Sequence, residues 1–68
     1  METIIKERIK EKGIKIKWLA EQIGIAPRTL SDWISYKNIT QVEQFSKLLL
    51  ILELNTAEVM QEIYEKKD

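Results

Sequence analysis

The polar side chains best placed to bind a ligand are those of Arg28, Ser31 and Asp32, which follow Pro27. Their spacing of three to four residues puts them on one face of a helix. An arginine there donates two hydrogen bonds to the O6 and N7 atoms of a guanine, a contact worth about 1–3 kcal/mol of discrimination. A serine reaches a base edge or a phosphate, and an aspartate accepts from a cytosine amino group or pairs with the arginine. The plain alternative is that Arg28 is a solvent-exposed residue at the start of a helix.

Other kinds of site find little support in the composition. The 68 residues include no Cys and no His, so disulfides, thiolate metal sites, the usual zinc ligands and the usual general base are missing. Glu58 and Glu62 share a helical face, but we expect that face to be exposed, with nothing to perturb the two carboxylates. The sequence contains no nucleophile–base pair and no phosphate-binding glycine loop. We therefore expect no enzymatic activity and no cofactor or metal.

A pair of short helices must position this polar face. Apolar residues at helical spacing predict one helix over 16–23 and a second over 27–36. Gly24 follows the first helix, where a left-handed backbone needs a residue without Cβ. Pro27 suits a first helical position, because the N–H that proline lacks is not used there. The helix-turn-helix predicted in this way spans 16–37, and the second helix of such a pair commonly enters the DNA major groove.

Three further helices complete the all-α domain that we expect over residues 1–68. The first, over 3–12, begins at the N-cap Thr3 and ends at Gly13. Capping boxes at 40–43 and 55–58 predict helices over 41–53 and 56–65. The apolar residues expected to form the buried faces of the five helices are Ile4, Ile5, Ile9, Leu19, Ala20, Ile23, Leu30, Trp33, Ile34, Val42, Phe45, Leu48, Leu49, Leu52 and Val59.

The order and spacing of these residues resemble the phage repressor and Cro family of helix-turn-helix domains, also called the xenobiotic-response-element type. The matching segments are LAEQIGI at 19–25 and RTLSDWI at 28–34, and residues 43–54 resemble the family's fourth helix. The resemblance implies a compact five-helix, lambda-repressor-like domain. Its implied role is that of a phage or bacterial transcriptional regulator that binds double-stranded DNA, usually as a dimer on a two-fold operator.

The resemblance also assigns roles by position. The residues that would face the bases are Pro27, Arg28, Ser31 and Asp32. The residues that would contact the DNA backbone are Lys15, Lys17, Ala26, Thr29, Ser35, Lys37 and Asn38.

The sequence departs from the family pattern beside these positions. The family often has Gln where this chain has Ile16, and it usually has Gly where this chain has Tyr36. A tyrosine in a left-handed turn costs roughly 1–2 kcal/mol. We therefore expect the second helix of the pair to continue to Tyr36 or Lys37 and the chain to turn at Asn38.

Charge is unevenly distributed along the chain. The net charge is zero, but residues 1–40 carry eight Lys or Arg against five Asp or Glu, whereas residues 41–68 carry three against six. The first part therefore has a net charge of +3 and the second of −3, which places any positive potential on the half with the helix pair. The zero total, Asp32 and the acidic second half favour an alternative, in which an antirepressor-like module binds a repressor protein instead of DNA. Salt-dependent binding to DNA distinguishes the two.

Further expectations concern the large apolar residues. Trp33 falls on the buried face of its helix, and Trp18 is expected to be half-buried. Met60, Ile63 and Tyr64 either form an exposed strip for a homodimer or pack on the other helices. The longest apolar run, 48–52, is far too short to span a membrane, and the charged N-terminus does not resemble a signal peptide, so we expect a cytoplasmic protein.

Overall fold

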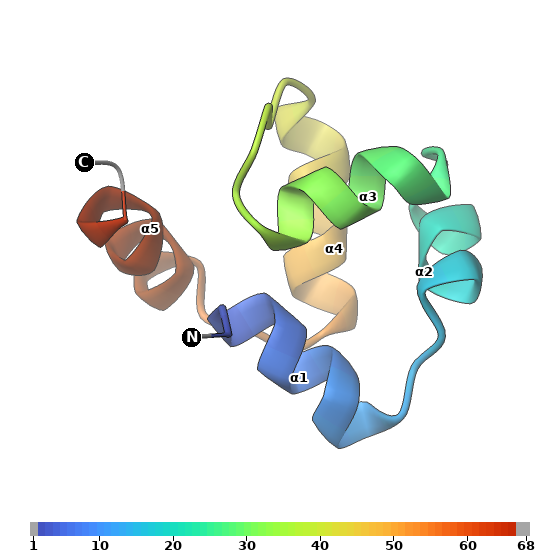
Figure 1. Cartoon of the computed structure of the whole chain (residues 1–68), viewed down its shortest axis with the longest axis horizontal. Helices are drawn as coiled ribbons and strands as arrows, with labels where there is room; N and C mark the ends of the chain where they lie inside the picture. The colour runs from blue at the N-terminus through green and yellow to red at the C-terminus, as the bar shows by residue number, and fades with distance from the viewer. Residues whose placement is uncertain (1, 67–68) are drawn as a thin grey trace.

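Five α-helices and no strand make up the part of the chain that the structure, a computed structural model, describes: residues 2–66 (Figure 1). In chain order the helices are α1 (Ile4–Lys12), α2 (Ile16–Ile23), α3 (Pro27–Ile34), α4 (Val42–Ile51) and α5 (Thr56–Glu65). The predicted all-α class is confirmed. Helix α2 packs against both α3 and α4, and α5 packs against α1 at the other end of the molecule.

Side-chain caps and left-handed turns begin and end the helices where the sequence indicates them. The Thr3 hydroxyl accepts from the Lys6 N–H at the start of α1, and the Asn55 side chain accepts from the Ala57 N–H at the start of α5. Gly13 and Gly24 follow α1 and α2 with φ of +66° and +88°, in the left-handed region where residues with a Cβ are disfavoured.

The start of α4 differs from the prediction. Its N-cap is Gln41 instead of Thr40, and within the described residues no side chain caps its first N–H groups, so the capping box predicted at 40–43 is wrong. Val42, which was expected on the buried face, is the first residue of the helix and is 73 % exposed, so that expectation is wrong. The helix ends at Ile51, one or two residues earlier than expected.

The end of α3 also differs. The helix stops at Ile34, and Tyr36 adopts the left-handed conformation with φ of +63°, so the prediction that the helix continues through Tyr36 is wrong. Asn38 is left-handed as expected, with φ of +51°. The chain therefore makes two left-handed steps between α3 and α4, and a tyrosine occupies the first of them.

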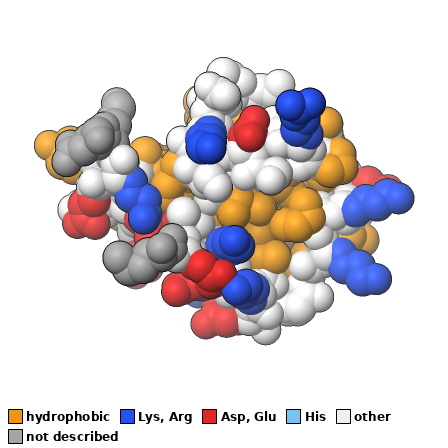
Figure 2. Space-filling model, viewed as in Figure 1, with side chains coloured by type: hydrophobic (Ala, Val, Ile, Leu, Met, Phe, Trp, Pro, Cys, Tyr) orange, Lys and Arg blue, Asp and Glu red, His pale blue; other side chains and the backbone are white. Residues whose placement is uncertain are grey.

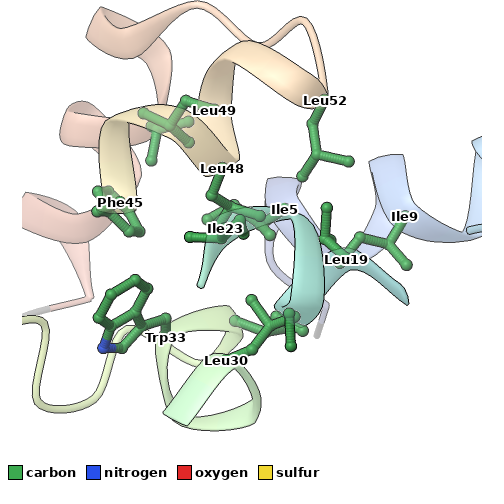
Figure 3. Packing of buried hydrophobic residues seen from close by; sticks show 13 residues of the cluster. Ile5, Ile9, Leu19, Ile23, Leu30, Trp33, Phe45, Leu48, Leu49 and Leu52 are labelled. Carbon is green, nitrogen blue, oxygen red and sulfur yellow. The ribbon is translucent and has the colours of Figure 1, made fainter. Parts of the chain in front are cut away.

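One apolar core lies between the helices (Figure 3). The Trp33 and Phe45 rings meet edge to face with their centroids 6.0 Å apart, an arrangement that aromatic pairs prefer. Leu48 of α4 and Leu52, the residue that follows α4, are fully buried in this core together with Ile5 of α1 and Leu19 of α2. This core fixes α3 against α2 and α4 and leaves the opposite face of α3 in contact with solvent.

Candidate nucleic-acid interface

The solvent-facing side of α3 carries the polar residues singled out in the sequence. Pro27, Arg28 and Ser31 are exposed, and Asp32 is half-buried on the same helix. Leu30, Trp33 and Ile34 occupy the opposite, buried face. Because the buried side chains anchor α3 to the core, the polar side chains are presented by a rigid element, as base recognition requires.

Basic side chains flank this face. Lys15 and Lys17 are exposed at the start of α2, and Lys37 is exposed just after α3. Figure 2 shows Lys and Arg side chains over α3 and beside α2 on one side of the molecule, with an acidic side chain between the basic ones over α3. The remaining positions predicted to contact a DNA backbone border the same face: Ala26, Ser35 and Asn38 are exposed and Thr29 is half-buried.

Helices α2 and α3 both begin without a side-chain cap among the described residues. The N-caps are Lys15 and Ala26, whose backbones are extended with ψ of 138° and 147°. Their first N–H groups therefore remain available to an outside acceptor, and a helix N-terminus attracts anions such as phosphate. Both helix starts lie on the basic half of the molecule.

Backbone hydrogen bonds hold the segment that follows α3. The Asp32 carbonyl accepts from the Ser35 N–H at 3.1 Å and from the Lys37 N–H at 2.8 Å. The Trp33 indole N–H donates to the Asn38 carbonyl at 3.2 Å. Because Trp33 is fully buried, this bond ties the turn directly to the core.

The structure adds a group of contacts that sequence reasoning missed. The Tyr36 hydroxyl donates a hydrogen bond to the Glu62 carboxylate on α5, and the Ile4 N–H donates to the same Oε1 atom at 2.8 Å. The expectation that Glu58 and Glu62 share an exposed face holds for Glu58 but is wrong for Glu62, which is half-buried and accepts both of these hydrogen bonds. Partial burial and the Glu62 carboxylate raise the pKa of Tyr36 above its ordinary value. The only sequence feature that pointed to these contacts was the tyrosine at position 36, where the family usually has Gly.

A second contact joins α1 to the end of α3. The Thr3 hydroxyl, which caps α1, also donates to the Ile34 carbonyl at 2.7 Å. Thr3 is only 8 % exposed, so this bond is shielded from water. The end of α3 is thus held from two sides, by Thr3 of the α1 cap and by Glu62 of α5.

The predicted dimer candidates lie on α5, away from the polar face of α3 (Figure 1). Met60 is 45 % exposed and Tyr64 is 77 % exposed, whereas Ile63 packs against the core. Met60, Ile63 and Tyr64 therefore take no part in the α3 surface. Trp18 of α2, expected to be half-buried, is 48 % exposed.

A helix-turn-helix whose second helix presents an exposed polar face is the architecture of a DNA-binding domain. A protein-family model described as "Helix-turn-helix" matches residues 5–59, and the chain therefore belongs to the Cro/C1-type helix-turn-helix family of DNA-binding regulators. This match confirms the resemblance seen in the sequence. Comparisons with curated proteins and with solved structures gave no match. None of the helices within residues 2–66 has the length and apolar character needed to cross a membrane.

Proposed function

We propose that this protein is a sequence-specific transcriptional regulator of phage or bacterial type that places α3, its recognition helix, in the DNA major groove. The observation that carries the proposal is the exposed polar face of α3, rigidly held by Leu30, Trp33 and Ile34 in the core. The family to which the chain belongs supports the general class. On this proposal the recognition helix comprises Pro27–Ile34, two residues shorter than predicted.

The side chains on this face divide into base readers and backbone contacts. Arg28 binds a guanine through paired hydrogen bonds, and Ser31 and Asp32 contact neighbouring bases, with Asp32 accepting from a cytosine amino group. Pro27 packs against the first base step. The residues assigned to sugar and phosphate are Lys15, Lys17, Ala26, Thr29, Ser35, Lys37 and Asn38, which fix the register of the protein without reading sequence.

Family members usually act as dimers, and we propose that Met60 and Tyr64, with Ile63 beneath them, form the contact between two copies. Exposed apolar side chains on one helix face favour a self-complementary interface. Analytical ultracentrifugation over a range of protein concentrations tests this, with Tyr64→Glu expected to shift the protein toward the monomer. A wild-type protein that remains monomeric at all concentrations would remove the dimer from the proposal.

The test of DNA binding is a fluorescence anisotropy titration with labelled duplexes over a series of salt concentrations. Duplexes enriched by selection on the wild-type protein are compared with a random-sequence pool. We expect Arg28→Ala to lower affinity for the enriched duplex by a factor of about 5–150, the equivalent of 1–3 kcal/mol, and to change affinity for random DNA far less. Lys47→Ala, a matched removal of one positive charge at an exposed position on α4, serves as the control.

The outcome decides between the two functions considered from the sequence. Steeply salt-dependent binding that Arg28→Ala weakens on the enriched duplex supports base reading by α3. A protein that is folded by circular dichroism and yet binds no duplex at low salt overturns the proposal. The same surface would then be available to a repressor protein.

A further inference from the structure

A hollow of about 300 Å³ opens between α1 and α3, next to the proposed recognition face. Its apolar wall is formed by Ile9 of α1, Ile16 of α2 and Ile34 of α3. Ile9 and Ile34 are nearly buried, whereas Ile16 is half-exposed. Figure 2 shows apolar side chains gathered in this region, below α3 and above α1, with basic and acidic side chains next to one another at their lower left.

Polar residues complete the lining of the hollow. Lys6 and Lys10 border it from α1, and Ser31 and Ser35 border it from α3. The acidic residues of α1, Glu7 and Glu11, lie outside the lining. Lys10 forms an ion pair with the Glu2 carboxylate. Because the Lys10 ammonium group is already paired, Lys6 is the lysine of the lining that has no ion pair among the described residues. The lining therefore combines an apolar wall with one unpaired lysine, one paired lysine and two serines.

We propose that this hollow binds a small carboxylate with an apolar body, such as a medium-chain fatty acid, and that the bound ligand opposes DNA binding. The apolar chain would lie on Ile9, Ile16 and Ile34, and the carboxylate would pair with the ammonium group of Lys6 on α1. The volume is at the lower end of the range for small-molecule pockets, and apolar walls with a few polar groups are typical of them. A neutral or cationic amphiphile would lack the charge match.

The position of the hollow gives the ligand a regulatory effect. Ser31 belongs to the base-reading face and Ser35 to the backbone contacts, and both also line the hollow. A ligand seated there would occupy space and hydrogen-bonding groups that DNA requires, so the two would compete. This regulatory part rests on the proposed function, whereas ligand binding itself does not.

The direct test is a titration of the ¹⁵N-labelled protein with octanoate, followed by two-dimensional NMR. Octylammonium has the same chain with the opposite charge, and acetate has the charge without the chain. We expect saturable shifts centred on Ile9, Ser31 and Ile34 with octanoate only. Lys6→Gln should weaken octanoate binding about five-fold, as expected for an exposed ion pair, whereas Lys47→Gln on α4 should not.

Three results would overturn ligand binding: no saturation at millimolar octanoate, equal binding of octylammonium, or shifts centred on α5. A competition titration with the enriched duplex then tests regulation. We expect octanoate to raise the apparent Kd for DNA, and to do so less in Lys6→Gln than in wild type. Unchanged DNA affinity at saturating octanoate overturns the regulatory part alone. Saturable octanoate binding by a protein that binds no DNA leaves the ligand site intact and refutes the proposed function instead.

Discussion

Replacing Tyr36 by Phe removes a single hydroxyl group from the turn after α3 and leaves the ring in place. That hydroxyl donates to the Glu62 carboxylate across 26 residues of sequence and helps to hold a tyrosine at φ of +63°. A left-handed conformation costs a residue with a Cβ about 1–2 kcal/mol, so the turn needs a compensating contact. The ring supplies packing against the core, and the hydroxyl supplies the bond to α5.

The expected loss follows from the kind of bond removed. A hydrogen bond to a charged group contributes about 1.5–3 kcal/mol. Tyr36 is half-buried and Glu62 keeps the Ile4 N–H as a donor, so we expect the lower end, about 1.5 kcal/mol. For a domain of this size, a loss of that order lowers Tm by about 6–12 °C.

The pH dependence provides a second, independent measure. The pKa of Tyr36 is raised in the folded protein, so the folded state holds the phenolic proton more tightly than the unfolded chain does. The stabilisation is complete below the unfolded pKa of about 10 and is lost as pH rises above it. The difference in stability between wild type and Tyr36→Phe should therefore shrink as the pH rises from about 9 to about 11.

Urea denaturation followed by circular dichroism at the two pH values measures both effects. Ser46→Ala, which removes one hydroxyl group at an exposed position on α4, is the control and should leave the free energy of unfolding nearly unchanged. A double-mutant cycle with Glu62→Gln isolates the pairwise energy. A Tyr36→Phe loss no greater than that of the control, or one that stays constant between the two pH values, would show that the hydroxyl does not hold the turn.

Three further predictions concern the helix ends, the core and the basic surface. Glu53→Gly should raise the free energy of unfolding, measured by urea denaturation, by roughly 0.5–1 kcal/mol, because Glu53 is left-handed with φ of +56° and its exposed ion pair with Lys12 contributes little. A loss of stability in this variant would contradict the prediction. Leu48→Ala should lower the free energy of unfolding by about 2–5 kcal/mol, because Leu48 is fully buried and the surrounding helices cannot close the cavity that the substitution leaves. A smaller loss in thermal unfolding would mean that the helices do close the cavity. Lys15→Ala should weaken binding to enriched and random duplexes alike and reduce the slope of log K against log salt concentration by about one. An unchanged slope would show that Lys15 does not contact a phosphate.

Much of the fold could be predicted because its signals are local. Thr3 and Asn55 cap their helices through N–H groups two or three residues away, and Gly13 and Gly24 end helices through their own backbone freedom. The prediction of the cap at Thr40 failed although the sequence offered a plausible residue there. The N-cap is Gln41, one residue later, and among the described residues no side chain caps this helix.

In the candidate site, too, local features could be predicted from the sequence and features that depend on long-range contacts could not. The periodicity of Leu30, Trp33 and Ile34 predicted which side of α3 is buried, and so which side carries Arg28 and Ser31. Nothing local predicted that the turn after α3 would keep a left-handed tyrosine. Taken alone, the intrinsic cost of that conformation argued for a longer helix.

The five helices, most of their ends and the polar face of α3 could be predicted from local signals, because helical spacing, caps and glycine turns act over a few residues. The conformation of Tyr36, the role of Glu62 and the hollow between α1 and α3 became visible in the folded chain alone. They depend on residues far apart along the chain: the Glu62 carboxylate meets Tyr36 and Ile4 from 26 and 58 residues away. Such contacts depend on how complete helices pack, and the hollow exists only where α1 and α3 are held side by side.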